Sequence, residues 1–258
     1  RLVSESGDGL AAEPRPYMYV WHPHGFISFV PSFIMGGKAV AGQPHGRHWF
    51  GTCIGLLFNI PLLGEIFTLT NARPVDRRSL DSILSQGGSV ALQPGGVKEQ
   101  AATQHDQEQA YFPAKLGFIR MAIKYGLPLM PLYLFGENQL YKRVSGFEWL
   151  TKLIKQCTGM TLPIVTAKWG MPQAGAFPIA TDIHIRWGKP VEVGPPDAEP
   201  SDEKVQEVYT RYVAELKRLF EANAKDCLPA AVAAKGLKIV KLGDAQPEVV
   251  WAGGYRSG

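Results

Sequence analysis

The sequence has few cysteines and a small net charge, and both features exclude some classes of protein. Only three of its 258 residues are cysteines (Cys53, Cys157 and Cys227), so they cannot form a closed disulfide framework. This usage is typical of a chain in a reducing compartment. Lys and Arg number 27 against 23 Asp and Glu, which gives a net charge of only +4. That excess is too small and too scattered to indicate a nucleic-acid partner.

No uninterrupted apolar run is long enough to cross a membrane. Residues 49–67 come closest, but Asn59, Pro61 and Glu65 interrupt them, whereas a span needs about 20 apolar residues. We therefore expect these residues to form core, or a surface that dips into lipid. Because the chain starts at Arg1, we also expect it to be a processed or truncated product.

Common catalytic and metal-binding motifs are also missing. The sequence contains no GxSxG, HExxH, CxxC or P-loop motif. Four of its six histidines do lie close together: His22, His24, His45 and His48. No Asp or Glu between Glu13 and Glu65 could complete or orient such a metal site. We therefore expect no metal, and we interpret His45 and His48 as polar loop residues.

Apolar periodicity predicts alternating strands and helices. Runs typical of strands occupy residues 17–21, 89–93, 127–135 and 181–188, and helical spacing occurs at 76–86, at 116–126 and after Ser201. This order predicts an α/β fold with a mixed or mostly parallel sheet flanked by helices. We expect an irregular N-terminal segment (1–16), one domain (17–227) and a C-terminal extension (228–258).

Two predicted strands end in unusual loops. The first runs directly into His22-Pro23-His24-Gly25, and the strand at 89–93 ends at Pro94-Gly95-Gly96. Reactive groups in α/β sheets gather where strands end. A neutral imidazole at such a position is suited to removing a proton from a hydroxyl. From residue type alone, a pair of structural histidines is the favoured interpretation.

The HPHG segment and four later blocks resemble the type-2 diacylglycerol acyltransferase family, which includes monoacylglycerol and wax-alcohol acyltransferases. The later blocks are PGGVKE (94–99), residues 115–144 with FGEN at 135–138, WGKPVEV (187–193) and the helix at 211–221. The resemblance extends from about Tyr17 to Cys227 and implies a fold similar to that of glycerophosphate acyltransferases.

The family resemblance implies transfer of a fatty acyl group from acyl-CoA to diacylglycerol or a similar neutral lipid alcohol. His24 corresponds to the general base, and no cofactor is needed beyond acyl-CoA as co-substrate. The residues after His24 include no acid to orient its imidazole, so His22 and Glu99 are the candidates for that role. Backbone N–H groups near Gly95 and Gly96 would stabilise the oxyanion.

The acceptor class depends on the segment from Gln93 to Lys98. Relatives that use phosphorylated acceptors have Phe-Pro-Glu-Gly-Thr-Arg there, whose Arg can bind the acceptor's phosphate. This chain has QPGGVK instead, which predicts a neutral acceptor. Lys98 occupies the position of the arginine, however, so an anionic acceptor is an alternative prediction.

Further residues are candidates for contact with substrate. Glu137 and Asn138 of the FGEN segment could bind a glycerol hydroxyl, or they could form a tight turn that caps the residues after it. A second group of apolar side chains could line a lipid groove that ends at His24, or form packed core: Phe26, Phe29, Phe33, Leu57 and Phe58.

The resemblance also implies where such a chain acts. We expect a protein of triacylglycerol synthesis at a membrane surface, that of the endoplasmic reticulum or of another organelle. An alternative is a catalytically idle homologue that serves as a subunit of a membrane-protein assembly. The intact HPHG segment and Glu99 favour the enzyme.

Overall fold

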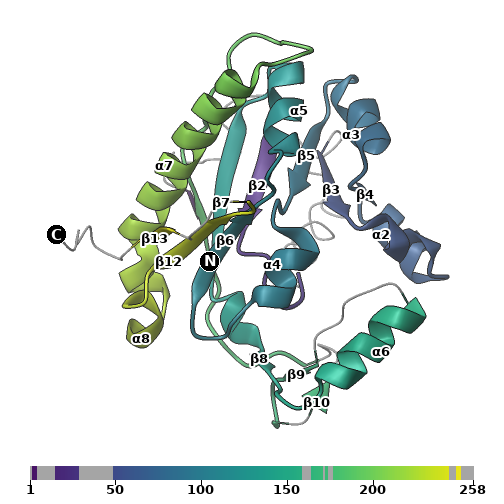
Figure 1. The fold of residues 1–258 in the computed structure, drawn as a ribbon, viewed down its shortest axis with the longest axis vertical. Helices are drawn as coiled ribbons and strands as arrows, with labels where there is room; N and C mark the ends of the chain where they lie inside the picture. Colours follow the sequence, from purple (N-terminus) through teal and green to yellow (C-terminus); the bar gives the residue numbers. More distant parts are fainter. Residues whose placement is uncertain are drawn as a thin grey trace.

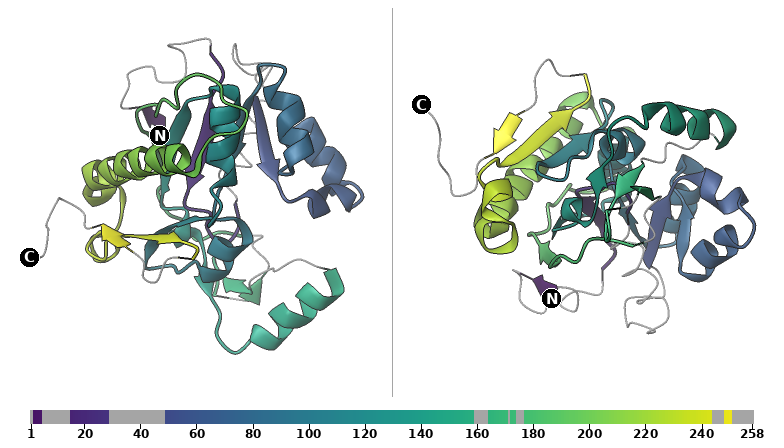
Figure 2. Two further views of the ribbon diagram at one scale, coloured as in Figure 1. Left: turned by 45° about the horizontal axis from the view of Figure 1, so that its top comes forward. Right: turned by 90° about the horizontal axis from the view of Figure 1, so that it is seen from below.

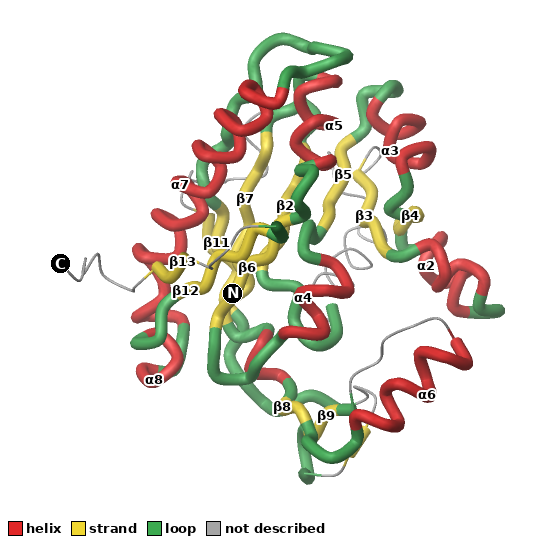
Figure 3. The backbone as a smooth tube through the Cα atoms, viewed as in Figure 1, coloured by secondary structure: helices red, strands yellow, loops and turns green. Residues whose placement is uncertain are grey.

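A central seven-stranded sheet organises the molecule (Figures 1 and 3). The computed structural model describes residues 2–4, 15–28, 49–158, 164–170, 172–173, 177–243 and 248–250. In spatial order the strands are β1 (Leu2–Ser4), β11 (His184–Trp187), β7 (Leu129–Phe135), β2 (Met18–His22), β5 (Ser89–Leu92), β3 (Trp49–Cys53) and β4 (Ala72–Pro74). The pairs from β7 to β4 are parallel, and β11 is antiparallel to β7. The predicted fold class is confirmed.

Strands β2 and β7 form the centre of this sheet. They pair in parallel, from Met18 opposite Leu129 to His22 opposite Tyr133. Every residue of both strands is buried. Continuous apolar runs such as LMPLYLF are typical of parallel strands that are covered on both faces. The carboxyl ends of β2 and β7 therefore meet at one edge of the sheet.

Three helices cover one face of the sheet: α3 (Arg77–Leu84), α5 (Gly117–Tyr125) and α7 (Asp202–Cys227). Figure 1 shows the long α7 and α5 packed over the central strands. The Ser201 side chain caps α7 by accepting a hydrogen bond from the N–H of Lys204, as predicted. Gly126 ends α5 in the left-handed conformation (φ 63°), a role that glycine fills at little cost.

The other face of the sheet is rich in aromatic side chains. Its buried cluster includes Tyr19, Trp21, Trp49 and Trp187. The ring of Tyr19 lies edge-on to Trp49 and to Trp187, with centroids 5.4 and 5.9 Å apart. Because side chains alternate along β2, Tyr19 and Trp21 lie on this aromatic face, and Val20 and His22 lie on the face that the helices cover.

Smaller elements surround the sheet. Two three-stranded sheets consist of β6 (Glu108–Phe112), β12 (Leu237–Lys241) and β13 (Glu248–Val250), and of β8 (Lys142–Arg143), β9 (Val165–Thr166) and β10 (Pro172–Gln173). In the described part of the chain, the remaining helices are α2 (Leu63–Leu69), α4 (Gly96–Ala102), α6 (Glu148–Thr158) and α8 (Ala230–Ala233), and the 3₁₀ turns are η2 (Gly55–Asn59) and η3 (Asn138–Leu140). In Figures 1 and 2, α2 and α6 lie on the same side of the molecule.

Both ends of the chain differ from the sequence-based expectation. Residues 2–4, within the segment expected to be irregular, form β1 and pair in parallel with β11 at the sheet edge. Residues 237–241, within the expected C-terminal extension, form β12 and pair in parallel with β6. Backbone pairing with strands distant in the sequence therefore ties these segments to the domain.

Residues 49–67 do not form one continuous element. They contribute β3 to the sheet, then η2, and then the beginning of α2. Across the described ranges, no helix is both long enough and apolar enough to traverse a bilayer. The interruptions at Asn59 and Pro61 fall where η2 ends, before α2 begins.

Candidate active site

Three loops converge at the carboxyl edge of the parallel strands. The HPHG segment begins at the last residue of β2, residues 93–96 follow β5, and residues 136–138 follow β7. Because β2 pairs in parallel with both β5 and β7, the three loops leave the sheet side by side. This is the edge at which α/β sheets assemble reactive groups. The structure thus brings together the HPHG, PGG and FGEN segments that the sequence singles out.

Glu99 is the buried anchor of this edge. Its side chain, on α4, is fully inaccessible to solvent. Oε1 accepts a hydrogen bond from the backbone N–H of His24 at 2.8 Å, and Oε2 accepts one from the N–H of Tyr111 at 3.1 Å. Burial raises the pKa of Glu99 to about 8, although the two N–H donors lower it. Glu99 therefore holds the backbone at His24 and does not orient the imidazole directly.

The imidazole of His24 has its own partner. Its Nδ1 lies 3.2 Å from the carbonyl oxygen of Gly25. Because a carbonyl only accepts hydrogen bonds, this contact places the proton on Nδ1 and leaves a lone pair on Nε2. Burial lowers the pKa of His24 below its ordinary value, so the ring is neutral at pH 7. A neutral ring with Nε2 unprotonated is the form required of a general base.

Two glycines let the loops approach each other closely. A Cβ built on Gly25, whose φ is +71°, would lie 2.9 Å from Cγ of Glu137. A Cβ on Gly95 would lie 2.0 Å from Oε2 of Glu99. Only glycine fits at these contacts. The N–H of Gly96 donates to the carbonyl oxygen of Gln93 at 3.3 Å, so this donor, one of the two expected for the oxyanion, is engaged in a turn.

Two glutamines that sequence reasoning missed connect the loops. Gln93 donates from Nε2 to the carbonyl oxygen of Pro23 at 3.1 Å and accepts a hydrogen bond from Ser28. Gln100 donates from Nε2 to the carbonyl oxygen of Phe26 at 2.7 Å. Both side chains hold residues 23–28 against the loop and helix that follow β5. A glutamine at the end of a predicted strand is the only signal the sequence offers for Gln93.

His22 is the last residue of β2, and its side chain lies in the core between the sheet and the helices that cover it. It is fully buried, its Nε2 is hydrogen-bonded to the hydroxyl of Tyr212 at 3.1 Å, and its ring contacts Phe112 at a centroid distance of 5.2 Å. Burial lowers the pKa of His22 to about 3. His22 thus fixes β2 against α7, while His24 occupies the loop beyond.

The FGEN segment forms a tight turn against a buried acid that the sequence did not reveal. Glu108 is fully buried and accepts hydrogen bonds from Tyr133 (2.8 Å), Gln139 (3.0 Å) and Asn138 (3.3 Å). Burial raises the pKa of Glu108. Asn138 thus has a structural partner, and Glu137 packs against Gly25. Substrate contact by Glu137 or Asn138 stays a prediction.

The predicted lipid-binding side chains fall into three groups. Phe26 is fully buried in a small cluster with Leu140, Tyr141, Val165 and Ala167. Leu57 and Phe58 are half-buried in η2, and the Phe58 ring lies 6.0 Å from that of Phe67. Phe29 and Phe33 lie outside the described residues, as do His45 and His48. A lipid-lining role for these five apolar residues stays a prediction.

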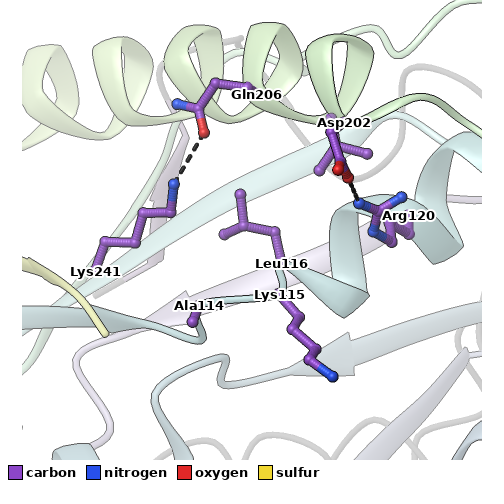
Figure 4. Close-up of a pocket in the computed structure, with 8 residues that line it drawn as sticks. Ala114, Lys115, Leu116, Arg120, Asp202, Gln206 and Lys241 are labelled. Carbon is purple, nitrogen blue, oxygen red and sulfur yellow. Dashed lines mark hydrogen bonds and ion pairs between the residues drawn. The ribbon is translucent and has the colours of Figure 1, made fainter. Parts of the chain in front are cut away.

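A separate hollow of about 470 Å³ lies between α5, α7 and the end of β12 (Figure 4). Its charged lining residues are Lys115, Arg120, Lys241 and Asp202. Arg120 is paired with Asp202, and Lys241 donates to the side chain of Gln206 at 2.9 Å. None of the predicted site residues lines this hollow.

Comparison with known proteins decides the family. The family model described as diacylglycerol acyltransferase matches residues 4–229, most of the chain. This chain belongs to the diacylglycerol acyltransferase family. The predicted family resemblance is confirmed, and the family match begins at residue 4, whereas we expected the resemblance to begin at about Tyr17.

Individual relatives agree with this assignment. Human 2-acylglycerol O-acyltransferase 3 is 30% identical over 84% of this chain and 67% of its own length. Diacylglycerol O-acyltransferase 1 of Schizosaccharomyces pombe is 26% identical (83% and 65%), and diacylglycerol O-acyltransferase 2B of Umbelopsis ramanniana is 28% identical (80% and 62%). The chain thus spans about two thirds of the length of these relatives. Their names support the predicted enzyme class, an O-acyltransferase of glycerolipids.

Among solved structures, the 1-acyl-sn-glycerophosphate acyltransferase PlsC from Thermotoga maritima is similar. It shares 16% sequence identity and a TM-score of 0.46, over 84% of this chain and 72% of that chain.

Proposed function

We propose that this protein transfers a fatty acyl group from acyl-CoA to the hydroxyl of diacylglycerol or a similar neutral lipid alcohol. The observation that supports this most directly is the arrangement at His24. Its imidazole stands at the carboxyl edge of the sheet, and Nδ1 contacts the carbonyl oxygen of Gly25. That contact leaves Nε2 as the proton acceptor.

The reaction proceeds by direct attack in this proposal. Nε2 of His24 takes the proton of the acceptor hydroxyl as its oxygen attacks the thioester carbonyl. The tetrahedral intermediate then collapses, the C–S bond breaks, and the CoA thiolate takes the proton back from His24. The N–H of Gly95 is our candidate for stabilising the oxyanion.

Glu99 is a positioning residue in this mechanism. Its two oxygens hold the backbone N–H groups of His24 and Tyr111, so it fixes the loop that presents the imidazole. His22 has a similar indirect part because its contacts with Tyr212 and Phe112 anchor the end of β2. Neither residue exchanges a proton with substrate.

The choice of a neutral acceptor rests on the residues after β5. Gly95 and Gly96 offer no side chain to bind a phosphate, and Lys98 is exposed on α4. A phosphorylated acceptor needs a cation directed at its phosphate group. We therefore expect diacylglycerol, monoacylglycerol or a long-chain alcohol to be preferred over lysophosphatidate.

An acyl-transfer assay with a panel of acceptors tests the proposal. The purified protein is supplied with radiolabelled oleoyl-CoA and, in parallel, with diacylglycerol, monoacylglycerol, a long-chain alcohol or lysophosphatidate in detergent micelles. A labelled neutral ester is the expected product. A preference for lysophosphatidate that Lys98→Ala abolishes would overturn the choice of acceptor, and no transfer to any acceptor would overturn the activity.

We further propose that the protein acts at a membrane surface, that of the endoplasmic reticulum or of another organelle. Both the acceptor and the product of the proposed reaction are insoluble in water, so the enzyme must meet them in a lipid phase. Fractionation of cells that express the tagged full-length protein tests this localisation. Recovery with endoplasmic reticulum markers is expected, and recovery only in the soluble fraction would contradict it.

A further inference from the structure

The exposed apolar side chains are confined to one part of the fold. Among the described residues, every large apolar side chain that is exposed lies in a segment that follows the carboxyl end of a parallel strand. These residues are Ile54, Leu62, Ile66 and Leu69 after β3, Val75 after β4, Val97 after β5, and Trp149, Leu153, Trp169 and Phe177 between β7 and β11. The described helices α5 and α7 expose no such side chain.

This distribution coincides with the edge that presents His24. Strands β3, β5 and β7 end at the same edge as β2 because all four are parallel. The segment between β7 and β11 begins and ends at this edge of the sheet, because His184, the first residue of β11, pairs with Phe135, the last residue of β7. The segments that carry the exposed apolar side chains therefore leave the sheet at the reactive edge.

Helix α2 presents one half of this surface. Ile66 and Leu69 lie on α2 at helical spacing, and Leu62, the N-cap residue, lies four positions before Ile66. Leu62 and Leu69 are 74% and 78% exposed. Water contact with so large an apolar stripe is unfavourable for an isolated globular protein. An exposed apolar stripe of this kind marks a site of contact with lipid or with another protein.

Helix α6 and the turn after β9 present the other half. Trp149 and Trp169 are 62% and 64% exposed, and Leu153 lies one turn after Trp149 on the same face of α6. In Figures 1 and 3, α6 projects away from the body of the molecule on the side of α2. Exposed tryptophans are typical of segments that lie at the boundary between lipid and water.

Basic side chains accompany the apolar ones. Lys98 follows Val97, Lys152 lies on α6 between Trp149 and Leu153, and all three of Lys98, Lys152 and Lys168 are exposed. Nζ of Lys168 lies 5.3 Å from the ring centre of Trp169. The surface also carries an acidic side chain, Glu65, which is exposed on α2. Apolar side chains flanked by lysines match a bilayer whose headgroups are partly anionic.

We infer that the surface formed by α2, α6 and the turn at Trp169 docks onto an anionic lipid bilayer and turns the His24 edge toward it. We call this the docking surface. The inference rests on the proposed function, which requires an acceptor dissolved in lipid, and it adds which face of the protein meets the membrane. Occupation by lipid covers both apolar halves at once and leaves α7 and α5 in water.

Vesicle co-sedimentation tests the inference without any measurement of catalysis. The full chain is mixed with vesicles of phosphatidylcholine alone or of phosphatidylcholine with phosphatidylserine. Two double variants, Ile66→Glu with Leu69→Glu and Trp149→Glu with Leu153→Glu, should each lower the partition coefficient by about tenfold or more. Lys152→Glu with Lys168→Glu should lower binding to the anionic vesicles by about tenfold and remove the preference for them.

A control that matches the charge change of the two apolar double variants separates position from charge. Ser82→Glu with Gln86→Glu adds the same two acids on and just after α3, at exposed positions before β5. This control should bind anionic vesicles within about twofold of the original protein. Circular dichroism verifies that each variant is folded, and the substituted side chains are exposed, so folding should be retained.

Quenching of tryptophan fluorescence by lipids provides an independent check. Lipids brominated on the acyl chain should quench the fluorescence of Trp149 and Trp169, and most of this quenching should disappear in Trp149→Phe with Trp169→Phe. Unchanged binding of the α2 and α6 variants would overturn the inference. Self-association through this surface, without vesicle binding, would overturn it as well. Vesicle binding without acyl transfer would instead contradict the proposed function and leave the docking surface intact.

Discussion

The backbone N–H of His24 donates a hydrogen bond of 2.8 Å to Oε1 of Glu99, a residue 75 positions later in the chain. The second oxygen of Glu99 accepts from the N–H of Tyr111. One buried carboxyl group therefore joins the loop after β2, helix α4 and strand β6. The geometry of the proposed base depends on this group, although Glu99 does not touch the imidazole through a described hydrogen bond.

Substitution of Gly95 should disturb this junction. A Cβ at Gly95 would lie 2.0 Å from Oε2 of Glu99 and 2.8 Å from Cβ of Tyr111, so Gly95→Ala must displace Glu99. We expect kcat to fall by about a hundredfold, because small misplacements of catalytic groups are that costly. Steady-state acyl transfer measures the change.

Gly117→Ala is the matched control for Gly95→Ala. Nothing lies within 4 Å of a Cβ at Gly117, and its φ is not positive, so activity and stability should stay close to those of the original protein. Equal activity of the two variants would show that the close contact at Gly95 is unimportant.

Glu99 should make the folded state less stable as the pH rises. Its pKa is raised from 4.5 to about 8, so the folded protein binds more protons than the unfolded chain between these values. The contribution of Glu99 is fully present below pH 4.5 and is lost as the pH rises through 8. The total change is on the order of a few kcal/mol.

Glu99→Gln removes this titration. Denaturant unfolding at a series of pH values should show a flatter free energy of unfolding in the variant between pH 5 and about 8. Turnover should also fall, because the amide cannot accept both N–H bonds as the carboxyl group does. If the free energy of unfolding depended on pH equally in both proteins, the raised pKa of Glu99 would be contradicted.

His22 should have the opposite effect on stability. Its pKa is lowered from 6.5 to about 3 by burial, so its contribution is present above pH 6.5 and is lost as the pH falls toward 3. His22→Phe, which preserves most of the ring volume, should flatten the acid side of the stability curve. Tyr212→Phe should cost about 1 kcal/mol of the free energy of unfolding at neutral pH through loss of the shared hydrogen bond. An unchanged acid slope in His22→Phe would contradict this view of His22.

The sequence predicted the central strands and helices because their apolar patterns are strong and local. The run at 127–135 became β7, and the stripe after Ser201 became the buried face of α7. It did not predict β1 or β12, since three to five residues become strands there only through pairing with distant partners. Tertiary context decides such short segments.

The candidate site was predicted to a similar extent. His24, Gly95 and the FGEN segment do meet at one edge, because parallel strands end together. Glu108 and Gln100 were not predicted as site residues. A single polar residue in a helix or strand gives no periodic pattern that would reveal that its side chain is buried or which group it contacts. The hydrogen bonds of Glu99 could not be predicted either, because its partners are backbone N–H groups.

The pH dependence of turnover should reflect the environment of His24. Burial lowers the pKa of its imidazole below the ordinary 6.5, so the base form should persist in moderately acidic solution. The acid limb of kcat/KM should therefore have its midpoint below pH 6.5. An acid limb centred above pH 7 would indicate a different base.

The most direct test is the turnover of His24→Ala with oleoyl-CoA and diacylglycerol. If His24 is the general base, kcat should fall by about two to four orders of magnitude while acyl-CoA binding changes little. His184→Ala, at a half-buried histidine on β11, serves as the matched control and should retain activity. Turnover of folded His24→Ala equal to that of the original protein would contradict the proposed mechanism.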